Sequence, residues 1–135
     1  MQHLIRTVLL FAAALLMGFA ALVNVTISTP HLREDMSEIN VRPTLLGAIM
    51  LGLHFGSFAM FAFACLVLLA AIQSLRGIVA SRLSLAVIAV TYLGFGLAAF
   101  ALSGSHHTLG YVLIGLLILG AVAIRPHPVP SYRGR

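Results

Sequence analysis

No charged residue interrupts residues 83–124, LSLAVIAVTYLGFGLAAFALSGSHHTLGYVLIGLLILGAVAI. This uncharged run is about 42 residues long, and two shorter ones of about 26 and 33 residues precede it. A membrane-spanning helix needs about 20 apolar residues. Each shorter run therefore predicts one span, and the longest run predicts two. The sequence predicts an all-α integral membrane protein with four transmembrane helices.

The four expected spans are residues 7–27, 45–72, 83–102 and 106–124. They leave a long outer loop, 28–43, and a tail, 125–135. No segment remains for a soluble domain, so residues 1–135 are expected to form a single membrane domain. Within the loop, apolar residues recur at helical spacing, which predicts a short amphipathic helix that covers the mouth of the bundle or lies on the membrane surface.

Arginine distribution predicts the orientation of the chain. All eight cationic side chains are arginines, and the composition is 61% hydrophobic and 8% charged. Six of them fall on one side of a four-span arrangement: Arg6, Arg76, Arg82, Arg125, Arg133 and Arg135. Only Arg33 and Arg42 fall on the other side. Cytoplasmic segments are rich in arginine and lysine, so both termini are expected in the cytoplasm, and we expect a bacterial cytoplasmic (inner) membrane. Because these arginines lie at membrane boundaries, they do not indicate nucleic-acid binding.

The two halves of the chain resemble each other. When Arg6 is aligned with Arg82, the pair Gly18–Phe19 falls on Gly94–Phe95. A second alignment, with a gap in the outer loop, superimposes two glycines of span 45–72 on two glycines of span 106–124. This pattern predicts two tandem, similar helical hairpins, related by an axis along the membrane normal.

Small residues recur at helical spacing on two of the expected spans. Ala48, Gly52, Gly56 and Ala59 form a stripe on span 45–72, and Gly110 and Gly115 lie on span 106–124. Small residues allow helix backbones to approach closely in a membrane. Two interpretations remain open: packing inside the bundle, or a seam for a second copy or another membrane subunit.

Acidic residues are confined to a short part of the outer loop. The chain has three of them, Glu34, Asp35 and Glu38. A cation-coupled carrier usually places a carboxylate inside the membrane, and a di-metal bundle needs inward glutamates. No catalytic triad order, nucleotide loop or zinc spacing is present, and one cysteine excludes an intrachain disulfide. An enzyme or carrier is therefore the least favoured interpretation.

Histidines provide the remaining candidates for a site. His54 lies inside span 45–72, and His106 and His107 begin span 106–124. His107 precedes Tyr111 by four residues, so the two share a helix face. Three interpretations remain open for this outer group. The imidazoles stabilise the bundle by hydrogen bonds, line a pocket for a lipid- or quinone-like ligand, or ligate a metal or haem through His54 and His107.

The segment His107-Thr108-Leu109-Gly110-Tyr111, with its apolar run and Arg125-Pro126, resembles one core helix of the cytochrome b561 proteins. The resemblance covers about 30 residues. It implies a haem-ligating histidine at His106 or His107. The chain departs from that family because spans 7–27 and 83–102 carry no histidine and no further histidine-bearing helix follows.

The favoured expectation is a non-enzymatic subunit or binding module of a larger membrane complex, with a lipid- or quinone-like ligand near its outer face. The alternative is a haem- or quinone-binding electron-transfer protein. A small membrane carrier or enzyme comes third. Partners are expected to be the lipid bilayer and either other membrane subunits or further copies of the chain.

Overall fold

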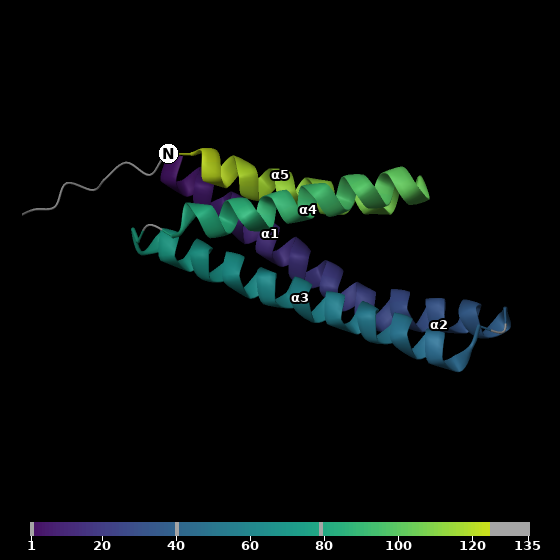
Figure 1. The fold of residues 1–135 in the computed structure, drawn as a ribbon. Helices are drawn as coiled ribbons and strands as arrows, with labels where there is room; N and C mark the ends of the chain where they lie inside the picture. The colour runs from purple at the N-terminus through teal and green to yellow at the C-terminus, as the bar shows by residue number, and fades with distance from the viewer. Residues whose placement is uncertain (1, 40, 79, 125–135) are drawn as a thin grey trace, which may run out of the picture. The chain divides into compact units, whose positions relative to one another are not determined.

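A computed structural model describes residues 2–39, 41–78 and 80–124, in which all secondary structure is helical (Figure 1). Four helical segments in these ranges are long and apolar enough to cross a membrane: Gln2–Glu38, Pro43–Leu75, Arg82–Ser103 and His106–Ala123. The prediction of an all-helical chain with four spanning helices is thus confirmed, and the chain has the architecture of a multi-pass membrane protein. Its orientation and tandem repeat stay predictions, and the expected tail, 125–135, lies outside the described residues.

The first spanning segment is longer than its apolar part. It consists of α1 (Gln2–Val23), the five-residue π-helix η1 (Asn24–Ser28) and α2 (Thr29–Glu38). Its 37 residues correspond to about 55 Å of helix, whereas the hydrocarbon layer is about 30 Å thick. The outer loop expected at 28–43 contains the short helix that its apolar spacing predicts, as α2, and this helix continues α1 through η1. Pro30 does not stop it, because proline is tolerated in the first turn of α2.

The remaining elements are α3 (Pro43–Leu75), α4 (Arg82–Ser103), the short 3₁₀-helix η2 (His106–Thr108) and α5 (Leu109–Ala123). Two glycines make the turns possible. Gly77 follows α3 with φ 73°, and Gly104 ends α4 with φ 64°. Side chains rarely adopt these angles. The Gly104 amide also donates to the Phe100 carbonyl, 2.8 Å away, and so closes the last turn of α4.

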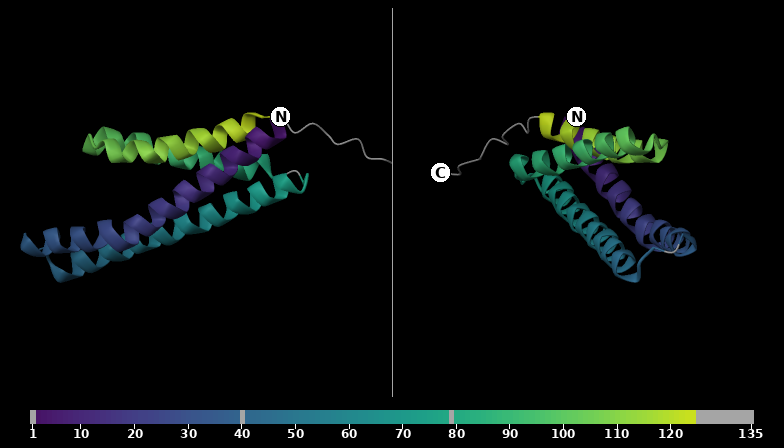
Figure 2. Two further views of the ribbon diagram at one scale, coloured as in Figure 1. Left: turned by 180° about the vertical axis from the view of Figure 1, so that it is seen from behind. Right: turned by 45° about the vertical axis from the view of Figure 1, so that its right-hand side comes forward.

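The chain divides into two compact units, and α1 and α3 each contribute to both. Unit 1 comprises residues 1–13 and 67–135, and unit 2 comprises residues 14–66. Unit 1 contains α4 and α5 with the beginning of α1 and the end of α3. Unit 2 contains the rest of α1, η1 and α2, with α2 running beside the first half of α3 (Figure 2).

In unit 1, α4 and α5 lie side by side (Figures 1 and 2). The two helices approach closely at two glycines. A Cβ atom added to Gly115 would lie 2.6 Å from Leu93 Cγ and 2.9 Å from the Ala89 carbonyl oxygen. One added to Gly96 would lie 2.8 Å from the backbone nitrogen of Val112. The two backbones therefore approach so closely that a larger residue at either position would force them apart. The buried apolar side chains of these two helices include Leu85, Ile88, Ile114 and Ile118.

In unit 2, one hydrogen bond between polar side chains joins η1 to α3. Asn24 Nδ2 donates to Ser57 Oγ over 2.7 Å, and Ser57 is 2% exposed. The Ser57 hydroxyl in turn donates to the Leu53 carbonyl in its own helix, at 2.9 Å. The Ser57 side chain is buried, so this bond gives its hydroxyl a partner for the lone pair that faces Asn24.

We expect the Asn24–Ser57 pair to stabilise unit 2 by a small, measurable amount. In a double-mutant cycle of Asn24→Ala and Ser57→Ala, the coupling energy should be about 0.6 kcal/mol, the average for such bonds between membrane helices. It is read from the free energy of unfolding in detergent. Thr26→Ala is the control, because the Thr26 hydroxyl donates only to Leu22 of its own helical segment. A coupling energy of zero would show that the bond adds nothing.

Candidate functional site

A groove of about 870 Å³ opens in unit 2 along α2 and the first half of α3. Its volume lies within the range of small-molecule sites, which is about 300–1,000 Å³. Residues from both helices line it, so its shape depends on the pairing of α2 with α3. It is the candidate functional site.

The α3 wall of the groove is mostly apolar and has one imidazole. Its lining residues are Pro43, Leu46, Gly47, Met50 and His54. Leu46 and Gly47 are neighbours, and the other steps between these residues are three or four, so the set shares one broad face of the helix. Eleven residues separate the first from the last, which corresponds to about 16 Å along the helix axis. Gly47 leaves room here, because a Cβ atom added to it would meet no atom within 4 Å.

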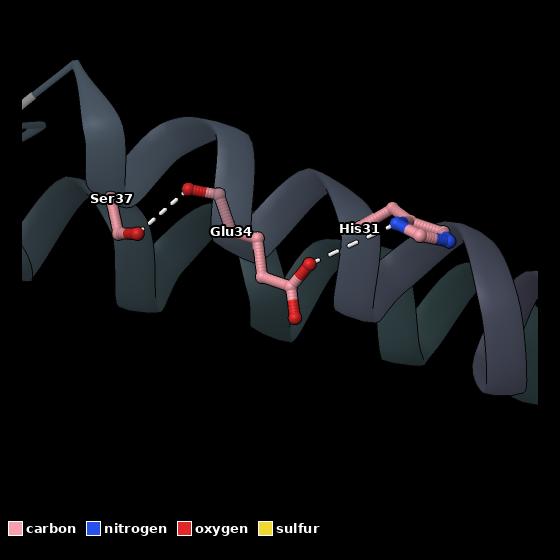
Figure 3. A network of polar contacts seen from close by, with 3 residues as sticks. All are labelled: His31, Glu34 and Ser37. Carbon is pink, nitrogen blue, oxygen red and sulfur yellow. Dashed lines mark hydrogen bonds and ion pairs between the residues drawn. The ribbon is translucent and has the colours of Figure 1, made fainter.

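The wall contributed by η1 and α2 is more polar. It consists of Val25, Thr29, Pro30, Arg33, Glu34 and Ser37. Glu34 belongs to a line of contacts along the exposed surface of α2 (Figure 3). His31 Nδ1 lies 3.9 Å from Glu34 Oε2, and the Ser37 hydroxyl donates to the Glu34 carbonyl over 2.7 Å. Because the His31 and Glu34 side chains are 74% and 76% exposed, their attraction is screened by solvent and contributes little to stability.

Because α2 and α3 run antiparallel, the polarity of the lining changes along the length of the groove. Four residues separate the end of α2 from the start of α3, so Ser37 and Pro43 lie near one end of the groove. Counting back along α2 and forward along α3 brings Val25 and His54 to the other end. We call the end near Ser37 and Pro43 the outer end of the groove, and the end near Val25 and His54 its inner end. The groove thus has charged and hydroxyl groups toward its outer end, a mostly apolar middle and one imidazole at its inner end.

The π-helix η1 sits at the inner end of this groove. Asn24 accepts two hydrogen bonds at its carbonyl: one from the Thr29 backbone amide and one from the Thr29 hydroxyl, at 2.7 Å. This wide turn places one more residue per turn than an α-helix and so changes which side chains of α2 face α3. Such π-turns occur often at functional sites. Val25 and Thr29, which belong to or adjoin the turn, both line the groove.

The other expected site residues belong to unit 1. His106 and His107 lie in η2 and are exposed, and the His106 ring is 6.2 Å from that of Phe100. Tyr111 packs against α4: its ring is 5.1 Å from that of Phe95, edge to face, and 6.3 Å from that of Tyr92. His54 belongs to unit 2. Binding of a ligand by all four residues together stays a prediction.

A bis-histidine haem needs two imidazoles that face each other across the iron, but His106 and His107 are consecutive residues of one short helix. These two residues therefore do not supply both ligands of one haem, and haem binding by His54 with His106 or His107 stays a prediction. Across residues 2–39, 41–78 and 80–124, no group of three or more His, Cys, Asp or Glu side chains is arranged to hold a metal ion.

The small residues expected to pack helices differ in their surroundings. Gly115 is buried where α5 approaches α4. The stripe on α3 is open within this chain: Ala48 and Gly52 are exposed, and a Cβ atom added to Gly52 or Gly56 would meet no atom within 4 Å. Ala59 is partly exposed, and Gly110 is as open as Gly52.

Comparison with known proteins does not assign the chain to a family. No protein-family model, curated protein or solved structure matches it. The fold defines the class of protein, a multi-pass helical membrane protein.

Sequence reasoning singled out His54 but missed the polar residues that share its groove, Arg33, Glu34 and Ser37. They are 17 to 21 positions away in the sequence, in a segment whose charges are typical of a loop. The helical spacing of the apolar residues in this segment was the available signal, because it also places Arg33 and Ser37 on one face.

Proposed function

We propose that this protein is a small membrane subunit that binds a lipid- or quinone-like ligand in the groove of unit 2. The observation that carries the proposal is the composition of this groove, in which an apolar middle separates a charged outer end from the imidazole of His54. An amphipathic molecule matches this gradation, because its apolar body needs apolar walls and its polar groups need hydrogen-bond partners.

The chemistry of each part supports this assignment. Val25, Leu46 and Met50 offer an aliphatic surface, and methionine adapts its shape to different ligands. The imidazole of His54 has a ring N–H that donates to a quinone carbonyl or an ester oxygen. At the outer end, Arg33 and Ser37 offer donors, and Glu34 offers an acceptor, to a headgroup or to water.

Binding of decylubiquinone to the purified chain tests the proposal. We expect saturable binding by the wild type in mild detergent, measured by equilibrium dialysis. Gly47→Leu adds bulk where the groove is open and should weaken binding about fivefold, as partial filling of an apolar site removes about 1 kcal/mol of ligand contact. His54→Ala should weaken binding by a similar factor, since one hydrogen bond contributes about 1 kcal/mol.

Gly52→Leu is the matched control, because it makes the same substitution in the same helix at a position that is equally open but does not line the groove. It should leave decylubiquinone binding unchanged. The proposal fails if the wild type shows no saturable binding of decylubiquinone or of a phospholipid of similar length. It also fails if Gly47→Leu and Gly52→Leu bind equally. A Soret band that shifts on reduction would instead support the haem-bearing alternative.

A further inference from the structure

A buried arginine near the start of α1 has no acidic side chain beside it among the described residues of unit 1. Arg6 is 2% exposed, and its Nε and Nη2 atoms are buried. Neither atom has a hydrogen-bond partner among the residues that the structure describes. A guanidinium that loses its hydration without gaining hydrogen bonds or an opposite charge is unfavourable. The arrangement therefore points to an anion that the chain itself does not supply.

The sequence explains why no acidic side chain neutralises Arg6. The three carboxylate side chains of the chain, Glu34, Asp35 and Glu38, all belong to unit 2. The charged neighbour of Arg6 within unit 1 is another cation, since Arg82 lies close enough for its charge to act on Arg6. Two like charges at short range repel each other. An anion between them would relieve both the repulsion and the missing hydrogen bonds.

The position of Arg82 places this pair at a membrane face. Arg82 is the first residue of α4, which is 22 residues long. A helix of this length spans about 33 Å, close to the thickness of the hydrocarbon layer of about 30 Å, so its first residue lies at the level of the lipid headgroups. In the first turn of α4 the Ser84 amide already donates to the Ser81 hydroxyl, and the positive end of the helix dipole at this turn also favours an anion.

We propose that Arg6 and Arg82 bind the phosphate of an anionic phospholipid at the end of unit 1 where α1 and α4 begin. The planar guanidinium group presents paired donors that match two oxygens of one phosphate. This site goes beyond the groove of unit 2, uses none of its residues and does not depend on the function proposed for it.

Lipid binding by the full chain tests the proposal. Native mass spectrometry of the detergent-purified protein would compare phosphatidylglycerol with phosphatidylcholine of the same acyl chains. We expect the wild type to prefer phosphatidylglycerol, and Arg6→Gln to weaken its binding about tenfold, the effect of losing a charge-assisted hydrogen-bonded pair. Arg82→Gln should weaken binding in the same direction. Arg76→Gln is the matched control, because Arg76 is an exposed arginine of the same unit, and it should leave binding unchanged.

If Arg6→Gln folds poorly, thermal unfolding of a second variant, Arg6→Met, tests the same proposal. In lipid-free detergent, Arg6→Met should be at least as stable as the wild type, since it removes a buried charge without a partner. Its Tm should not rise when phosphatidylglycerol is added, whereas that of the wild type and of Gly47→Leu should rise. An equal rise for Arg6→Met and the wild type would overturn the proposal, as would equal binding of both lipids by the wild type. If inorganic phosphate at the same concentration raised the Tm of the wild type but not that of Arg6→Met, the site would bind free phosphate, and the assignment to a lipid would be overturned.

Discussion

Replacing Gly115 by alanine is expected to lower the free energy of unfolding by about 2 kcal/mol, within the usual cost of adding an atom group to a tightly packed contact. The physical reason is the approach of α4 and α5. The new Cβ atom would lie 2.9 Å from the Ala89 carbonyl oxygen and 3.0 Å from the backbone nitrogen of Leu93. Backbone atoms cannot rotate away as the end of a side chain can, so the helices must separate and lose contacts along their length.

Gly96→Ala should have a similar effect from the other side of the same contact, because its Cβ atom would lie 2.8 Å from the backbone nitrogen of Val112. The two substitutions act on one interface, so their combined cost should differ from the sum of the two. Once either has moved the helices apart, the second meets less resistance. We therefore expect the double variant to lose less stability than the sum of the single variants.

Each substitution has a control on its own helix. Gly110 in α5 and Gly94 in α4 have open space where a Cβ atom would be added. Gly110→Ala and Gly94→Ala should leave stability unchanged or raise it slightly, because alanine favours the helix over glycine. All variants are compared by denaturant unfolding in the same detergent. Equal stability of Gly115→Ala and Gly110→Ala would contradict close packing of α4 on α5 at Gly115.

This contrast shows why glycine spacing alone could not identify the packed positions. Gly110 and Gly115 lie on the same helix, and both belong to the glycine pattern that suggested the repeat. Only the second meets a backbone. The relevant partner, Gly96, was not singled out, because a single glycine among apolar residues has the same local pattern whether its face is lipid-exposed or packed. Which face is covered depends on the pairing of helices and is not encoded in the residue itself.

The four spanning helices were predictable for a simpler reason. Hydrocarbon excludes charge over a fixed thickness, so the lengths of the uncharged runs indicate the number of crossings directly. A helix outside the membrane is not marked by a long uncharged run. Residues 29–38 have charges, a proline and few apolar side chains, and these features are equally typical of a loop and of a water-exposed helix. The apolar spacing in this segment predicted a short helix, but its unbroken continuation of α1 through η1 was not predictable, and neither was its pairing with α3, which places polar residues beside His54.

One of the interpretations of the small-residue stripe on α3 is a seam for a second copy, and it predicts that replacing Gly52 by leucine weakens self-association about thirtyfold, which corresponds to about 2 kcal/mol. Gly52 lies in the middle of the small-residue stripe on α3 with Ala48, Gly56 and Ala59. Membrane helices associate through such stripes because small side chains let two backbones approach and form many van der Waals contacts. Among the residues that the structure describes, no atom lies within 4 Å of a Cβ added at Gly52 or Gly56, so this interpretation places a second copy against that face. A leucine there would hold the two helices apart.

Sedimentation equilibrium in detergent measures this effect, with the protein-to-detergent ratio varied to shift the equilibrium. Gly47→Leu is the control, because it adds the same side chain to the same helix on the face that lines the groove, and it should associate as the wild type does. Each variant should therefore affect a different property. Gly47→Leu should weaken ligand binding without changing self-association. Gly52→Leu should weaken self-association without changing ligand binding. A wild type that stays monomeric at every ratio would contradict a second copy as the occupant of the stripe. A loss of both properties in either variant would show that the groove and the stripe are not separate surfaces.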